Sequence, residues 1–130
     1  MIAVDSSTWV AFLTGKGGED VSLLDTALGD KQVQMVPAVL TELLSDPKLS
    51  EAVATSLLAL PLLEIKPGYW RRAGALRAKV VARKRRARLG DALIAQSCID
   101  TGIPLLTRDH DFRAFADAAG LQLWTDFPKR

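Results

Sequence analysis

The chain has 130 residues and a mass of 14.1 kDa, so we expect residues 1–130 to form a single domain. Hydrophobic residues are 48% and charged residues 25%, a composition that excludes intrinsic disorder. The longest apolar run, residues 57–63, is too short to cross a membrane, and the N-terminus has no secretion signal. The single cysteine, Cys98, cannot form an internal disulfide, which favours a cytoplasmic location and an inert buried thiol.

The net charge of +2 conceals an uneven distribution of charged residues. Between Arg71 and Arg88 there are nine Lys or Arg residues and no acidic residue. The remainder of the chain therefore carries eight basic residues against all 15 acidic ones. This pattern predicts a basic segment that contacts phosphates and an acidic body that holds cations.

Short apolar segments alternate with helical patterns along the chain. The expected strands are residues 2–4, 33–36, 62–65, 103–107 and 121–124. The expected helices begin at Ser6 and near Glu19, and then cover residues 38–44, 49–60, 69–88, 92–100 and 112–119. Strands that are apolar throughout are typical of a parallel sheet covered on both faces. We therefore predict a three-layer α/β/α sandwich with a short parallel sheet.

Acidic residues occur where the expected strands end. Asp5 ends the first strand, Asp109 and Asp111 follow the fourth, Asp91 starts a helix, and Glu42 lies early in the helix after the second strand. Ligands of open parallel sheets bind beyond the carboxyl ends of the strands, so these side chains are candidates for a common site. Each also has a structural interpretation. The three residues Asp5, Asp91 and Asp111 could cap helices, and Glu42 could lie on a helix surface or at the edge of a buried stripe.

Several carboxylates at one sheet edge repel one another unless a cation neutralises them. Oxygen ligands suit Mg²⁺ or Mn²⁺, whereas the sequence has no Cys/His cluster of the kind that binds zinc. The acidic set therefore predicts a divalent-metal site for hydrolysis of a phosphodiester bond.

Four segments, taken in order, carry a family resemblance. They are IAVDSS at residues 2–7, Glu42 following VPAV at 36–39, GDALIA at 90–95 and LLTRDHDF at 105–112. Together they resemble the PIN-domain ribonucleases, specifically the VapC-type toxins of bacterial type II toxin–antitoxin pairs. The resemblance extends over essentially the whole chain and rests on the ordered set, because no single segment is specific.

The resemblance implies a PIN fold and an endoribonuclease that depends on Mg²⁺ or Mn²⁺. The implied catalytic residues are Asp5, Glu42, Asp91 and Asp109, and the implied metal ligands are Asp5, Asp91, Asp109 and Asp111. Members of the family differ in whether the position of Asp109 or that of Asp111 is closer to the metal, and we expect Asp109.

Two hydroxyl positions and the partners also follow from the resemblance. Ser7 and Thr107 match family positions that orient carboxylates or metal-bound waters. The family further implies a homodimer, an RNA substrate and a cognate small antitoxin whose C-terminal segment packs on the toxin.

The basic segment has both a functional and a structural interpretation. On the expected helix 69–88 it could be a solvated face, but four consecutive cations on a helix repel one another. Nearby phosphates would relieve that repulsion, so we predict RNA-backbone contacts. The residues concerned are Arg83, Lys84, Arg85, Arg86 and Arg88. We expect His110 to face solvent, and the glycine-rich residues 15–18 lack the pattern of a phosphate-binding loop.

Other classes of function remain open from the residues alone. A receiver-like signalling domain also has an acidic Mg²⁺ pocket, but it normally needs paired acids at the first strand, where this chain has only Asp5. A phosphatase of the haloacid dehalogenase type would want a second Asp where Ser7 stands. A module that binds RNA or a partner without cutting is the third alternative.

Overall fold

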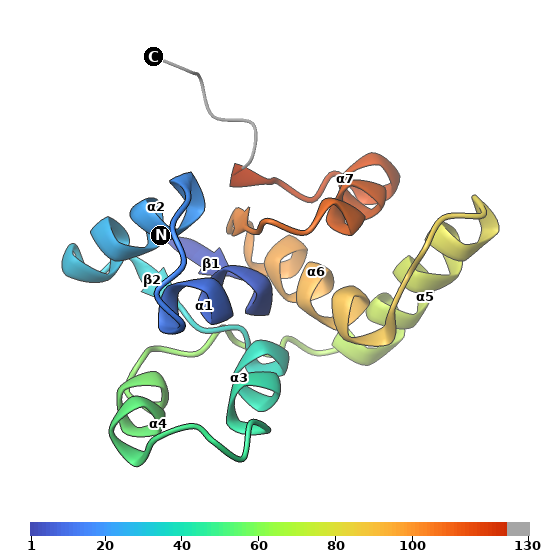
Figure 1. Ribbon diagram of the computed structural model, residues 1–130. Coiled ribbons are helices and arrows are strands. Elements are labelled where there is room, and N and C mark those ends of the chain that lie inside the picture. Colours follow the sequence, from blue (N-terminus) through green and yellow to red (C-terminus); the bar gives the residue numbers. More distant parts are fainter. Residues whose placement is uncertain (125–130) are drawn as a thin grey trace.

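A short parallel sheet forms the centre of the computed structural model, which describes residues 1–124 (Figure 1). The strands are β1 (Ile2–Val4), β2 (Val33–Gln34) and β3 (Leu105–Leu106), in the order β2-β1-β3. Ile2 pairs with Val33 and Ala3 with Leu105, and both pairings are parallel. All three β1 residues are buried, as expected of a central strand covered on both faces. The predicted α/β sandwich with a parallel sheet is confirmed.

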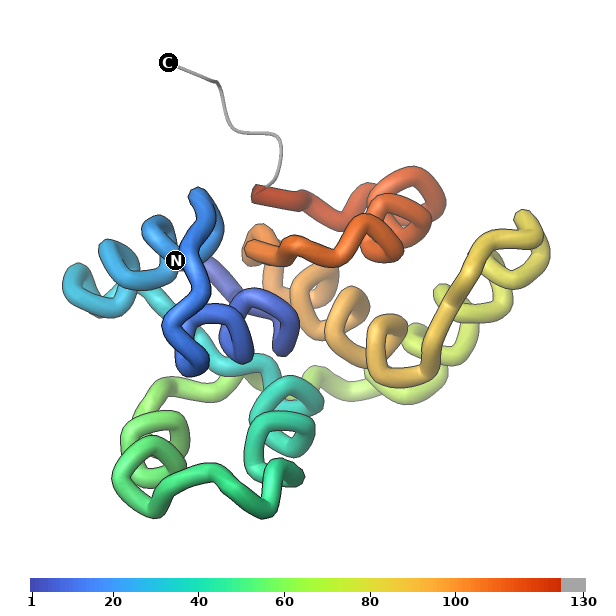
Figure 2. Tube along the Cα trace, viewed as in Figure 1, coloured from blue at the N-terminus to red at the C-terminus, as the bar shows by residue number. Residues whose placement is uncertain are grey.

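Helices surround this sheet. In the described part of the chain they are α1 (Ser6–Leu13), α2 (Glu19–Gly29), α3 (Pro37–Leu44), α4 (Glu51–Leu58), α5 (Tyr69–Ala82), α6 (Leu89–Thr101) and α7 (Arg113–Ala119), with a 3-10 turn at His110–Phe112. Figure 2 shows α2 and α5 at opposite sides of the molecule, with α6 between α5 and the sheet. None of the described helices is long and apolar enough to span a membrane.

Two of the predicted strands are reduced to single bridges. Leu62 bridges Met35 beyond β2, and Leu123 bridges Leu105 in β3. The predictions of strands at 62–65 and 121–124 were therefore wrong in extent. The reason is the length of their partners, because β2 and β3 have two residues each and offer little edge for pairing.

The basic helix is shorter than predicted. It ends at Ala82, and Lys84 has a φ of +59°, which no helix accommodates. The expected repulsion between adjacent cations is consistent with this early end, and the residues after it form a loop that returns toward α7. The following helix begins at Leu89, which places Asp91 in its first turn.

The hydrophobic core packs around β1. Its largest fully buried side chains include Trp9, Phe112 and Phe115. Cys98 is also buried, and burial raises the pKa of its thiol to about 12, as expected of an unreactive cysteine.

Candidate metal centre

Three carboxylates converge at the carboxyl end of the sheet. One oxygen each from Asp91, Asp109 and Asp111 lies within 4.8 Å of the other two, and all three residues are half-buried. Asp91 comes from the first turn of α6, whereas the other two come from the turn after β3. The tertiary structure thus brings together side chains from two segments that the sequence separates.

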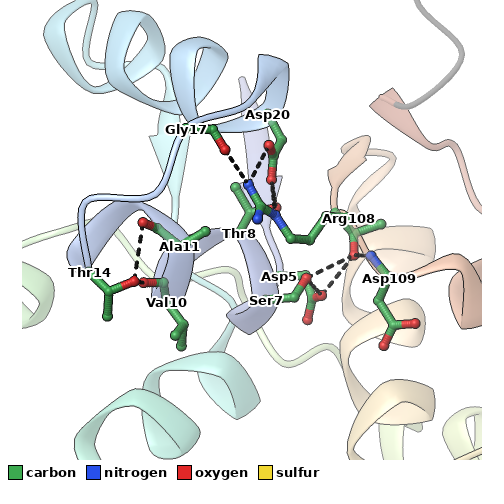
Figure 3. A network of polar contacts seen from close by, with 11 residues as sticks. Asp5, Ser7, Thr8, Val10, Ala11, Thr14, Gly17, Asp20, Arg108 and Asp109 are labelled. Atoms are coloured by element: carbon green, nitrogen blue, oxygen red, sulfur yellow. Dashed lines mark hydrogen bonds and ion pairs between the residues drawn. The ribbon is translucent and has the colours of Figure 1, made fainter.

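Asp5 lies deeper, beside this group of three. It is 4% exposed, and its Oδ2 accepts hydrogen bonds from Ser7 Oγ at 2.6 Å and Thr107 Oγ1 at 2.7 Å. Thr107 Oγ1 in turn accepts the backbone N–H of Asp109 at 2.9 Å. Both predicted hydroxyl residues therefore contact the acidic set, and Thr107 links Asp5 to Asp109. Figure 3 shows Asp5, Ser7 and Asp109 around this point.

Glu42 reaches the site from α3. It is exposed, so it does not belong to a buried stripe, and its Oε1 accepts a hydrogen bond from Ser6 Oγ at 2.5 Å. A Cβ atom on Gly90 would lie 3.8 Å from Glu42 Oε2, which places this carboxylate beside the start of α6. Ser6 was missed by the sequence analysis, although its place in the Asp-Ser-Ser run was a usable signal.

The electrostatics of the site centre on Asp91. Its pKa is raised to about 6, first by burial and then by the negative charges of Asp5 and Asp109, while Arg88 opposes the shift. Its Oδ2 atom is buried and has no hydrogen-bond partner in the part of the chain that the structure describes. A buried carboxylate oxygen without a donor, facing other carboxylates, is the arrangement that a bound cation would stabilise.

The helix-cap interpretation is wrong for Asp91 and Asp111, and for Asp5 it holds for the position alone. Arg88 occupies the N-cap position of α6, two residues before Gly90 and three before Asp91. Asp5 stands at the N-cap of α1 but makes no capping hydrogen bond with its side chain. Asp109, rather than Asp111, caps the 3-10 turn, because its Oδ1 accepts the N–H of Asp111 at 2.9 Å.

The basic loop extends from Arg83 to Arg88 along the flank of the site. Arg83 donates to the backbone carbonyl of Asp117 at 3.3 Å, and Arg85 forms a 3.0 Å ion pair with the carboxylate of the same residue. Arg86 Nη1 lies 3.7 Å from Asp111 Oδ2, so the loop touches the acidic group directly. Lys84 is exposed, and so is His110, as predicted.

The comparisons with known proteins identify the family. A family model described as PIN domain matches residues 2–118, so the chain belongs to the PIN domain family. This confirms the resemblance noted in the sequence. No curated protein matches the chain at a significant level.

Solved structures with the same fold come from toxin–antitoxin complexes. A chain of VapBC from Salmonella typhimurium, bound to DNA, is similar with a TM-score of 0.70, 17% identity, and coverage of 95% of this chain and 97% of that one. A chain of VapBC2 from Rickettsia felis, bound to a promoter DNA fragment, is similar with a TM-score of 0.69 and 20% identity. The match covers 95% of this chain and 97% of that one. A chain of VapBC-5 from Mycobacterium tuberculosis is similar with a TM-score of 0.63 and 22% identity. The match covers 94% of this chain and 95% of that one. At these identities the likeness shows a shared fold.

Proposed function

We propose that this PIN-family chain is a metal-dependent endoribonuclease that acts in the cytoplasm as a VapC-type toxin. The observation that carries the proposal is the buried Oδ2 of Asp91, which has no hydrogen-bond partner among residues 1–124 and lies among carboxylates from two segments of the chain. Membership of the PIN family replaces the receiver-like and phosphatase alternatives. Only the binding module that does not cut remains as a competing function.

In the proposed site, Asp91, Asp109 and Asp111 hold Mg²⁺ or Mn²⁺, with Asp5 behind them. Bound there, the ion would lower the pKa of an attacking water and neutralise charge on the scissile phosphate. Ser7 and Thr107 donate to Asp5 and keep its carboxylate oriented. Glu42, exposed beside the start of α6, is the proposed acceptor of a proton from the attacking water.

The basic loop is the proposed contact for the RNA backbone. Arg86 already lies against Asp111, so a phosphate held by this loop would sit beside the acidic group. Counterion release should make binding by such a loop depend on salt. Changing Lys84, Arg86 and Arg88 to Ala should weaken RNA binding about 10-fold or more and reduce the salt slope by about 2 to 3.

A matched variant on the same loop tests that assignment. Asp117→Ala removes the carboxylate that pairs with Arg85 and so frees that cation, and RNA binding should tighten and the salt slope should steepen. Filter binding across a salt series measures both variants. An unchanged slope in the triple variant would contradict the RNA contact.

The toxin role rests on the shared fold with chains from VapBC complexes. A cognate antitoxin and a homodimer are the proposed protein partners. Light scattering of the purified chain measures the oligomeric state, and growth arrest on expression, relieved by the neighbouring small gene product, tests the toxin role.

Cleavage of total cellular RNA is the decisive experiment. In Mg²⁺ or Mn²⁺ we expect discrete fragments, which should vanish in EDTA and with Asp91→Asn. Sequencing the fragment ends would name the target. Intact RNA, from protein that is folded and free of antitoxin, would favour the binding module instead.

A further inference from the structure

Arg108 directly precedes Asp109, yet its guanidinium points away from the acidic group (Figure 3). Its Nε and Nη2 donate to the two carboxylate oxygens of Asp20, each at 2.8 Å, and Nη2 also donates to the carbonyl of Gly17 at 3.1 Å. A fork of this kind matches a carboxylate in two places at once and fixes its orientation as well as its distance. The side chain of Arg108 therefore binds to α2 and to the loop before it.

The carboxylate of Asp20 is fixed in position by a second contact besides Arg108. It lies in the first turn of α2 with its side chain 15% exposed, and its Oδ2 also accepts a hydrogen bond from Thr8 Oγ1 at 2.9 Å. The hydrogen bonds from Arg108 are the main reason that the pKa of Asp20 lies below its ordinary value. The carboxylate consequently stays charged, and the pair stays formed, at neutral pH.

The glycine-rich loop between α1 and α2 is shaped around this pair. Gly18 has a φ of +141°, and a Cβ atom there would lie 2.6 Å from Asp20 Oδ1 and 3.0 Å from Arg108 Nη2. Any other residue would be strained and would collide with the ion pair. The pair thus accounts for the glycine at position 18, in a loop that does not fit the phosphate-binding pattern.

The pair acts on the same turn that carries the metal ligands. On one side of Arg108, Thr107 is bonded to Asp5, and on the other the N–H of Asp109 is bonded to Thr107. Repulsion between Asp91 and the carboxylates of this turn favours their separation when no cation is bound. The ion pair between Arg108 and Asp20 opposes that separation.

We infer that Arg108 and Asp20 form a positioning pair that holds the turn at residues 107–111 in the geometry in which Asp109 meets Asp91. The inference rests on the proposed metal-dependent function. It gives Arg108 no contact with RNA and assigns its effect to metal affinity and to turnover. Supporting contacts of this kind change metal affinity or activity by about 10- to 100-fold when they are removed.

The test compares Arg108→Gln and Asp20→Asn with a control, Asp117→Asn, which removes an exposed ion pair with Arg85. Titration with Mn²⁺, followed by electron paramagnetic resonance, should show binding weakened about 10- to 100-fold in the first two variants. In the control, Mn²⁺ binding should stay within about 2-fold of the wild type. Thermal melts set a temperature at which every variant is folded.

Cleavage kinetics separate positioning from direct contact with RNA. For Arg108→Gln we expect a lower kcat with an unchanged KM and an unchanged salt slope. A raised KM and a flatter slope, with Mn²⁺ affinity unaltered, would overturn the inference in favour of a phosphate contact. Arg108→Lys keeps the charge without the fork, so it should recover only part of the Mn²⁺ affinity.

A further measurement keeps this inference distinct from the proposed function. If the wild-type chain binds no Mn²⁺, the proposed function fails, and hydrogen exchange of the amides at 109–112 in EDTA then decides the role of the pair. Faster exchange in Arg108→Gln and Asp20→Asn, but not in Asp117→Asn, supports positioning. Equal exchange in all four proteins would overturn it.

Discussion

The two ends of helix α6 place the same residue type in opposite environments. At its start, Asp91 has one buried oxygen that finds no hydrogen-bond partner within the described residues, and its pKa is raised to about 6 by burial and by neighbouring negative charges. Near its end, the carboxylate of Asp100 accepts three hydrogen bonds. The donors are Arg72 Nε at 3.0 Å, Arg72 Nη2 at 2.6 Å and Gln96 Nε2 at 2.8 Å. The hydrogen bonds from Arg72 lower the pKa of Asp100.

This contrast separates a stabilising carboxylate from one available for binding. Asp100 is 8% exposed in its side chain, and its charge is fully satisfied within the protein. Asp91 is held among like charges, which lowers stability but leaves ligand positions open to a cation. A carboxylate gathered with others and left without donors is the better candidate for function.

Removing the charge of Asp91 should abolish function at the start of α6 without lowering stability. Asp91→Asn should reduce RNA cleavage about 1,000-fold or more, since it removes a central metal ligand. The melting temperature in EDTA should stay the same or rise, because the repulsion from Asp5 and Asp109 is relieved. Cleavage assays and thermal melts measure the two effects. Loss of folding together with activity would show that Asp91 is structural.

The two remaining carboxylates should differ in importance. Asp109→Asn should reduce cleavage about 100-fold, whereas Asp111→Asn should reduce it about 10-fold, because Asp111 also lies against Arg86. Initial rates at saturating Mn²⁺ give the ratio. The reverse order would make Asp111 the closer ligand.

At the other end of α6, Asp100→Asn should affect stability and leave activity per folded molecule intact. Loss of the charged hydrogen bonds from Arg72 should lower the free energy of unfolding by about 1–3 kcal/mol. Urea unfolding measures this change, with Asp117→Asn as a control for an exposed ion pair. Equal losses in both variants would remove the distinction between them.

The smallest expected effect is the pH dependence of the stability difference between the wild type and Asp100→Asn. The pKa of Asp100 is lower in the folded chain than its ordinary value of about 3.9, so its stabilisation is complete above that value. It is lost as the pH falls through the folded pKa. The stability gap between wild type and Asp100→Asn should therefore be constant from about pH 6 to 8 and should shrink below about pH 4. A gap that widens in acid would contradict the assigned shift.

Much of the fold was readable from the sequence because the signals are local. Apolar runs predicted the three parallel strands, and Gly102 and Gly120 mark the ends of α6 and α7 in left-handed conformations. The extent of pairing was not readable, because it depends on the partner strand, so residues 62–65 and 121–124 were overestimated. The end of α5 was missed because cation repulsion and the contacts with Asp117 outweigh helix periodicity.

The sequence by itself determined which residues could form the site: an ordered series of acids after apolar strands, and the family they resemble. Only the tertiary structure decided how these acids are arranged. It placed Asp91, Asp109 and Asp111 together with Asp5 hydrogen-bonded behind them, and it turned Arg108 away to Asp20. The physical reason is range, since strand and helix signals act over a few residues, whereas hydrogen bonds and charges act between segments joined only by folding.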